Sequence, residues 1–369
     1  MWNEMREQPT LPHSDKYGGF FVVTRLADLR KVTAKPALFS SAKGVALPSE
    51  DRSPHIPEEV DPPLHGEYRR LLEPFLTQDE VAKLEPMVRR HVLDLLDSFA
   101  GETRIDFVRR FSEPLPVRFS LEAFGFPRED EAMLFDLVSR IIGERGKEGG
   151  RIAAKGLSDY LARLLDLKAA PGTSASDIVT AIASGSIENR PLTIDEKVSM
   201  TRLLLFGGFT TVNIALSSTL FQFTRNPELV QQLRDNPSLI TTAVDEFVRL
   251  ASPGTYLRRT VTADVELGGT QLHPGDQVLL CFGAANRDPT TFSNPDDVQL
   301  DRNPNPHVGF GFGAHRCMGS WVGKLEIKVA LEELLKRYDR FELDPEAQLE
   351  WGSGETQGLT TLPLILHPR

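Results

Sequence analysis

Residues 310–321 read FGFGAHRCMGSW and place three glycines and a histidine around Cys317, one of only two cysteines in the chain. The other, Cys281, lies in the apolar run LLCF and is typical of a buried small hydrophobic residue. Three roles are open to Cys317: a buried structural thiol, a catalytic nucleophile or a metal ligand. Its position just before an expected helix favours a thiolate, because unpaired N–H groups and the positive end of the helix dipole stabilise negative charge.

The residues around Cys317 separate these roles. A zinc site needs three or four Cys, His or carboxylate ligands at close spacing, and only His315 is near. A cysteine nucleophile needs a base and an orienting group, and the local sequence offers neither. A haem iron needs one protein ligand on its proximal side, and a thiolate there favours O–O cleavage. Gly311, Gly313 and Gly319 remove side chains around the sulfur, which lets the backbone approach a large flat group. Haem ligation fits best.

Length, charge and cysteine content limit the class of protein. The 369 residues are 40% hydrophobic and 25% charged, which is ordinary for a soluble globular protein, and we expect one domain over residues 1–369 because no linker or repeat divides them. Two cysteines cannot form a disulfide framework, so a reducing cytoplasm is the expected compartment. The net charge of −10 argues against nucleic acid as the main partner. The N-terminal residues contain no apolar signal segment or membrane anchor.

The distribution of apolar residues predicts a mainly α-helical protein with a small β-sheet region. Helical spacing runs from about residue 79 to 250, and a helix is expected over residues 321–338 after the glycine-rich loop. β-Branched residues and turn signals predict strands within 255–282 and again within 359–367. Residues 203–224 carry no charge over nearly the length of a membrane span. Their glycines, serines and threonines instead favour a long helix that is buried on all sides within a soluble protein.

The stretch FGFGAHRCMG resembles the F-G-x-G-x-H-x-C-x-G signature of the cytochrome P450 superfamily of haem-thiolate monooxygenases. EFVR at 246–249, ANRDP at 285–289, LDR ending at 302 and DPPLHGEYRR at 61–70 resemble further family segments in the expected order. The resemblance runs from about residue 20 to the C-terminus and is closest to soluble bacterial members of the camphor-hydroxylase type. It implies a triangular prism of helices, with haem b between the long central helix and the helix that follows the cysteine loop.

The resemblance implies roles for individual residues, each of which also has an ordinary structural interpretation. Cys317 ligates the iron, Phe310 packs near the thiolate, and Gly311 and Gly319 shape the loop. The haem propionates are bound by His65, Arg69, Arg259 and His315, with Arg259 preferred to Arg258 because it precedes Asp264 by five residues. Glu246, Arg249 and Arg302 form a buried structural triad; Glu246 and Arg249 alone could equally be an exposed helix pair.

The central helix departs from the family pattern. In GGFTTVN at 207–213, Gly207 and Gly208 leave room for dioxygen and substrate, and Thr211 matches the family threonine. Thr210 stands where the family has an acid, so the carboxylate that usually supplies protons is missing, unless another acid serves and Thr210 only bonds to a helix carbonyl. Gly323 and Lys324 replace a common Ala and Arg, and the N-terminus is shorter than in most relatives.

The resemblance predicts a monooxygenase that inserts one oxygen atom of O2 into a small, mostly apolar substrate, with electrons from a separate ferredoxin and an NAD(P)H-dependent reductase. A peroxide-driven oxidase is the alternative that Thr210 keeps open; a haem sensor is less favoured, because no output module is fused. A basic surface at Arg69, Arg70, Arg316 and Lys324 would receive the ferredoxin. By the same resemblance, candidates for the substrate pocket, several of them polar, are Ser53, His55, Phe206, Thr255, Tyr256, Leu257 and Thr356.

Overall fold

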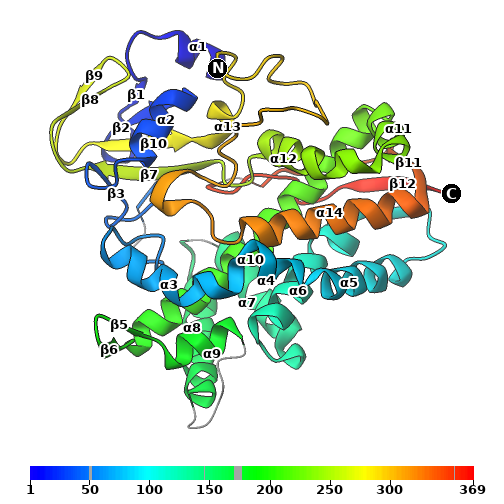
Figure 1. Ribbon diagram of the computed structural model, residues 1–369, viewed down its shortest axis with the longest axis horizontal. Helices are drawn as coiled ribbons and strands as arrows, with labels where there is room; N and C mark the ends of the chain where they lie inside the picture. Colours follow the sequence, from blue (N-terminus) through cyan, green and yellow to red (C-terminus); the bar gives the residue numbers. More distant parts are fainter. Residues whose placement is uncertain (50–51, 145, 170–176, 353) are drawn as a thin grey trace.

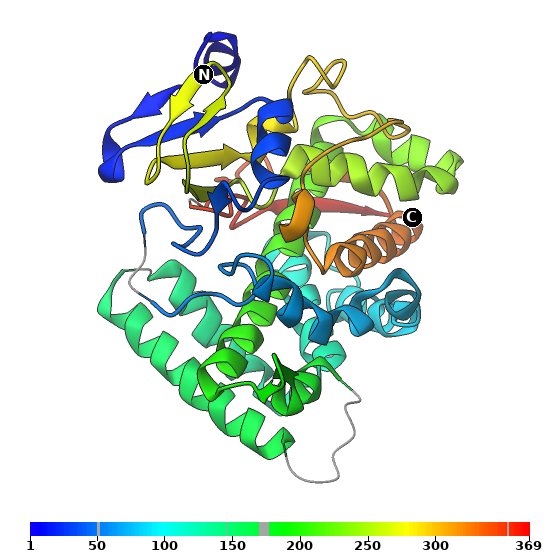
Figure 2. The same ribbon diagram turned by 60° about the vertical axis from the view of Figure 1, so that its left-hand side comes forward.

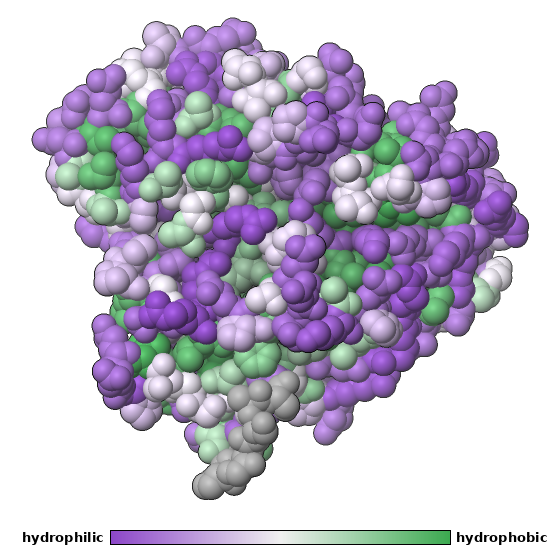
Figure 3. All heavy atoms as spheres, viewed as in Figure 1, coloured by the Kyte–Doolittle hydropathy of each residue, from purple (hydrophilic) through white to green (hydrophobic). Residues whose placement is uncertain are grey.

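A computed structural model describes residues 1–369 except 50–51, 145, 170–176 and 353. It is 53% helical, and the prediction of a mainly α-helical fold with small sheets is confirmed. Figure 1 shows the sheet that contains β2, β7 and β10 at one end of the molecule, with most helices at the other end. Polar side chains cover most of the face in Figure 3, and apolar side chains show there in small groups.

Helices supply most of the core. The first two are α1 (Trp2–Glu7) and α2 (Leu26–Thr33), followed by α3 (Leu64–Leu76), α4 (Gln78–Ala82), α5 (Glu85–Ser98) and α6 (Pro114–Phe124). The series continues with α7 (Glu131–Gly143), α8 (Glu148–Lys168), α9 (Ile178–Ser184), α10 (Ile194–Arg225), α11 (Glu228–Asp235), α12 (Ile240–Ala251), α13 (Phe282–Ala285) and α14 (Ser320–Arg337). The largest apolar cluster joins α5, α6, α8, α10, α12 and α14, and it fixes where α10 and α14 lie relative to each other.

The long helix α10 passes through the middle of the helical region, as Figure 2 shows. It begins at a capping box, in which the Thr193 hydroxyl accepts from the Glu196 N–H and the Glu196 carboxylate accepts from the Thr193 N–H. The helix is long and apolar enough to span a membrane, but half of its most apolar window is buried among neighbouring helices. Burial on all sides, as predicted, is wrong: Gly207 is exposed and Thr211 is only half-buried.

Two small sheets flank the helices. The larger has the order β1 (His13–Ser14), β2 (Phe20–Val23), β10 (Gln277–Cys281), β7 (Tyr256–Val261) and β3 (Phe39–Ser40). The second consists of β11 (Tyr338–Leu343), β12 (Pro363–Pro368) and β4 (Arg104–Asp106), and the hairpins β5 (Ser186–Ile187) with β6 (Arg190–Pro191) and β8 (Val265–Leu267) with β9 (Thr270–Leu272) complete the strands described. A second apolar cluster lies beneath the larger sheet and includes Val23, Leu29 and Val278.

The strands predicted within 255–282 and 359–367 are present, but the sequence analysis missed their partners. β2 pairs in parallel with β10 across more than 250 residues of chain, and β4 pairs with β12. Such short strands carry little periodicity of their own, and their pairing depends on contacts between distant segments. The predicted helix over 321–338 is nearly correct, since α14 ends at Arg337 and Tyr338 starts β11.

Candidate active site

The loop before α14 is held in one conformation by its own backbone. The Cys317 N–H donates to the Phe310 carbonyl at 2.8 Å, which closes the loop upon itself. Gly311 and Gly313 have φ values of +72° and +73°, a region that glycine adopts without strain. A Cβ on Gly313 would lie 2.3 Å from the Thr33 carbonyl oxygen, so α2 packs against the loop directly. These contacts fix the position of the Cys317 sulfur.

The two cysteines have different surroundings. Burial alone raises the pKa of the Cys281 thiol to about 12, as for a structural residue. Burial also raises the pKa of Cys317, but a hydrogen bond from the Gly319 N–H and the positive charges of Arg316 and Arg69 oppose the rise. The Cys317 side chain is nevertheless accessible to solvent. The Gly319 donor and the two guanidinium charges favour the thiolate, although burial outweighs them and keeps the pKa of Cys317 raised.

The central helix crosses α14 next to this loop. A Cβ on Gly323 would lie 3.6 Å from Val212 Cγ2, so the two helices are in close contact six residues after Cys317. Thr211 immediately precedes Val212, and its hydroxyl donates to the Gly207 carbonyl at 3.1 Å. Among the described residues, a Cβ on Gly207 would meet no atom within 4 Å apart from the backbone of α10 itself. The accessible face of α10 at Gly207 and Thr211 therefore borders open space close to the cysteine loop, and this space is called the recess below.

Gly208 and Thr210, the other two candidate residues on α10, have different surroundings. Gly208 faces α6, and a Cβ there would lie 2.6 Å from Ser120 Oγ. Gly208 thus permits helix packing, whereas the predicted role of making room for dioxygen and substrate fits Gly207. Thr210 is half-buried, and its hydroxyl makes no hydrogen bond to a helix carbonyl within the part of the chain described. The back-bond considered for Thr210 is instead made by Thr211.

Four hydrogen-bond donors predicted to bind haem propionates lie together. His65 and His315 have ring centroids 4.2 Å apart, and Arg259 and Arg69 interact electrostatically with His315. Burial, followed by the charge of Arg69, lowers the pKa of His65 to about 4. The pKa of His315 is lowered to about 3. Burial is the largest cause, followed by the charges of Arg259, His65 and Arg69. Both imidazoles are therefore neutral at pH 7, and each carries one N–H donor.

These donors fit a bound carboxylate. Within the described residues, the buried His315 Nδ1 has no hydrogen-bond partner, and the buried Arg259 makes one hydrogen bond, from Nη1 to the Arg258 carbonyl at 2.8 Å. Arg69 already donates to the carbonyls of Ala314 and Arg316, so it also ties α3 to the cysteine loop. Arg258, by contrast, donates to Gly44 and Gln277 and serves the scaffold. An accessible sulfur, open space and unused donors together suit a flat group bearing carboxylates.

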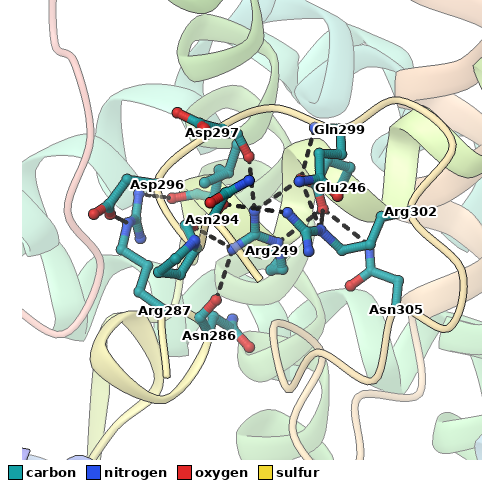
Figure 4. A network of polar contacts seen from close by, with 12 residues as sticks. Glu246, Arg249, Asn286, Arg287, Asn294, Asp296, Asp297, Gln299, Arg302 and Asn305 are labelled. Atoms are coloured by element: carbon teal, nitrogen blue, oxygen red, sulfur yellow. Dashed lines mark hydrogen bonds and ion pairs between the residues drawn. The ribbon is translucent and has the colours of Figure 1, made fainter. Parts of the chain in front are cut away.

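The residues expected to form a structural triad are in contact. Arg249 donates to both carboxylate oxygens of Glu246 at 2.8 and 2.7 Å, and Arg302 Nε lies 3.0 Å from Glu246 Oε2. Figure 4 shows both guanidinium groups pointing at this carboxylate, which also accepts from the Gln299 N–H at 3.0 Å. Burial alone would raise the pKa of Glu246, but these donors hold it below its usual value. Arg249 also binds the carbonyl of Asn286, so the triad anchors the chain that leads to the cysteine loop.

The predicted pocket residues form two groups. The His55 ring packs edge-on against Phe206 with centroids 5.5 Å apart, next to Gly207. In the second group, Gly254 bridges to Thr356 and the Thr255 N–H donates to the Glu355 carbonyl at 2.7 Å. Tyr256 and Leu257 follow on β7 and are half-buried. Ser53 is exposed, and its carbonyl accepts from Arg202 of α10 at 3.2 Å.

Glu58 lies between these two groups, and the sequence analysis missed it. Its Oε2 is 3.9 Å from His55 Nδ1, and its carboxyl interacts electrostatically with Glu355, Arg259 and Cys317. Burial and the charge of neighbouring Glu59 raise the pKa of Glu58 to about 7. The available signal was the acidic pair in IPEEVDPPLH, immediately before the segment that carries His65.

Comparison with known proteins identifies the family. Residues 132–364 match the family model for cytochrome P450. The chain belongs to the cytochrome P450 family. Linalool 8-monooxygenase of Pseudomonas putida is 31% identical to it, over 99% of this chain and 94% of that protein. Mycinamicin IV hydroxylase/epoxidase of Micromonospora griseorubida is 32% identical, over 94% and 89%. The crystal structure of CYP109E1 from Bacillus megaterium with testosterone aligns at a TM-score of 0.89 and 27% identity, covering 99% of this chain and 96% of that one.

Membership confirms the resemblance drawn from the cysteine loop and the fold expected from it. The protein is an oxidoreductase of the P450 monooxygenase type and binds haem b, as members of this family do. The recess beside Gly207, the accessible Cys317 sulfur and the donors His65, His315 and Arg259 are the features of the structure that suit that group.

Proposed function

We propose that Cys317 ligates the iron of haem b as a thiolate, and that the protein inserts one oxygen atom of O2 into a small, mostly apolar molecule. The observation that carries this is the accessible Cys317 sulfur, which accepts from the Gly319 N–H and is within electrostatic range of Arg316 and Arg69. The relatives named as a linalool monooxygenase and a mycinamicin hydroxylase support oxygen insertion as the reaction. Bound haem would supply the activation of O2.

The chain's own residues would orient the cofactor. Arg259, His65 and His315 would donate to the propionates, which provides the buried Arg259 and the unpaired His315 Nδ1 with acceptors. Arg69 would hold the cysteine loop to α3 and add positive charge near the same carboxylates. Phe310 would shield the sulfur, since its ring lies 3.8 Å from where a Gly323 Cβ would be, at the contact with α10.

On the α10 side, Gly207 would leave space for dioxygen and substrate, and Thr211 would present a hydroxyl beside it. The Thr211 proton is directed at the Gly207 carbonyl, so Thr211 would have to rotate its hydroxyl to donate toward the space beside Gly207, and the proton would have to be replaced. Thr210 cannot supply that proton as a carboxylic acid would, because a threonine hydroxyl does not ionise near neutral pH. Water or substrate would take over this step.

Electrons would come from a separate ferredoxin and an NAD(P)H-dependent reductase, and the protein would act in the cytoplasm. Of the expected basic docking surface, Arg316 is exposed and makes no ion pair in the described residues. Arg70 pairs with Glu67, Lys324 pairs with Asp245 at 2.6 Å, and Arg69 binds the cysteine loop. Arg316 is therefore the residue best placed to steer an acidic partner.

A peroxide-driven oxidation is the second candidate reaction. It is favoured by Thr210 in the place of the usual acid, because hydrogen peroxide brings its own protons and two electrons. Peroxide-driven turnover that is faster than turnover with ferredoxin would support it.

Replacement of each cysteine tests haem-thiolate ligation. Cys317→Ser should abolish the red-shifted Soret band of the reduced carbon monoxide complex, because a neutral hydroxyl does not replace a thiolate. Cys281→Ser is the matched control and should keep the band, since Cys281 is a structural thiol in β10. A purified protein without haem, or a Cys317→Ser variant that keeps the band, would refute the proposal.

A further inference from the structure

Hydrogen bonds of the residues on either side of Glu58 hold its segment in place. The neighbouring Glu59 carboxylate accepts from Arg52 at 2.7 and 3.0 Å and from the N–H groups of His55 and Val45 at 2.7 and 3.0 Å. The Ile56 N–H donates to Ser199 Oγ of α10 at 2.9 Å. Glu59 therefore has a structural role, and these bonds hold Glu58 beside α10.

Glu58 differs from Glu59 in having no hydrogen bond within the described chain. Its Oε2 lies 3.9 Å from His55 Nδ1, and 30% of the Glu58 side-chain surface is accessible. The carboxyl is within electrostatic range of Arg259 and Cys317, and burial raises its pKa to about 7. Through His55 it adjoins Phe206 and the open space at Gly207.

The positive charges near Glu58 have other acceptors to serve, apart from His55. Glu59 and Glu355 add negative charge, and Arg259 and Arg52 oppose it. Arg52 is bound to Glu59, and under the proposed function Arg259 is bound to the haem propionates. A partly buried carboxyl without a hydrogen bond is destabilising, and a donor group on a bound molecule offsets that cost.

We propose that Glu58 is the polar anchor of the substrate pocket, and that it accepts a hydrogen bond from a hydroxyl or protonated amine on an otherwise apolar substrate. This inference rests on the proposed function, because it places the substrate in the same recess as the haem. It predicts that carboxylate substrates bind weakly, because the ionised forms of Glu58 and Glu355 would repel their charge. Phe206 and Leu257 provide the apolar part of the wall.

The test uses haem-loaded protein and four ligands that share one C10 hydrocarbon skeleton: the hydrocarbon itself, its alcohol, its dimethylamine and its carboxylate. Dissociation constants are measured from the low-to-high spin shift of the Soret band and independently by equilibrium dialysis. Wild type should bind the alcohol and the amine at least about tenfold more tightly than the hydrocarbon, which corresponds to about 1.4 kcal/mol. The carboxylate should bind most weakly.

Three variants assign that preference to Glu58. Glu58→Leu should remove the preference for both the alcohol and the amine. Glu58→Gln keeps an acceptor oxygen but no charge, so it should keep the preference for the alcohol and lose that for the amine. Glu346→Gln removes an exposed carboxyl and should change neither. If Glu58→Leu does not fold, Glu58→Gln decides: loss of the preference for the amine alone supports the role of Glu58, and an unchanged preference overturns it.

Failure of the proposal for Glu58 can be distinguished from failure of the proposed function. Haem-loaded wild type that binds all four ligands alike, or a Glu58→Leu variant that keeps both preferences, overturns the role of Glu58 alone. A wild-type protein that takes up no haem overturns the proposed function, and the pocket assignment with it.

Discussion

Two adjacent glycines on α10 should respond oppositely to the same substitution. Gly207→Ala adds a methyl group where nothing lies within 4 Å, whereas Gly208→Ala places one 2.6 Å from Ser120 Oγ and 3.2 Å from Ser120 Cβ. Each change gains about 0.8–1.0 kcal/mol of helix propensity. Overpacking costs about 1–3 kcal/mol, and only Gly208→Ala incurs it. The Gly207→Ala variant should therefore be the more stable of the two by that difference.

The difference can be measured as thermal unfolding midpoints at equal haem content. An unfolding entropy of about 2.1 cal/mol/K per residue over 369 residues converts about 1–3 kcal/mol into about 1–4 °C. Gly207→Ala should also weaken the binding of bulky ligands in the spin-shift assay, because its methyl group enters the recess. Equal midpoints for the two variants, or a more stable Gly208→Ala, would refute the assignment of Gly207 to open space and Gly208 to the α6 contact.

Three further predictions concern electron supply, proton supply and pH. Arg316→Glu should slow electron transfer from an acidic ferredoxin several-fold at low ionic strength, and added salt should narrow the difference; stopped-flow rates that do not change exclude Arg316 from the interface. Thr210→Asp should increase product formed per NAD(P)H consumed relative to Thr210→Asn, and no gain over Asn contradicts the account of the missing acid. Glu326 is fully buried with both oxygens unpartnered among the described residues, and burial raises its pKa well above the usual value. The folded state then holds a proton that the unfolded chain releases above about pH 4.3, so stability falls as pH rises. Glu326→Gln should therefore raise the unfolding midpoint more at pH 8 than at pH 5, and an equal effect at both would contradict this.

The sequence by itself determined the features that depend on local backbone and spacing. The loop at 310–319 could be recognised because its glycines, histidine and cysteine lie within ten residues and close upon themselves through the bond from Cys317 to Phe310. The uncharged run at 203–224 predicted the central helix for a similar reason, since composition and length within one segment are sufficient. That residues 1–369 form a single domain stays a prediction.

Only the tertiary structure decided which distant residues share a recess. Sequence alone could not separate Gly207 from Gly208, because the difference is whether α6 or open space lies opposite. It also could not single out Glu58 from Glu59, since one acid is saturated by Arg52 and backbone N–H groups and the other is not. Burial and hydrogen bonding depend on contacts between segments far apart in the chain, and these contacts leave no local pattern in the sequence.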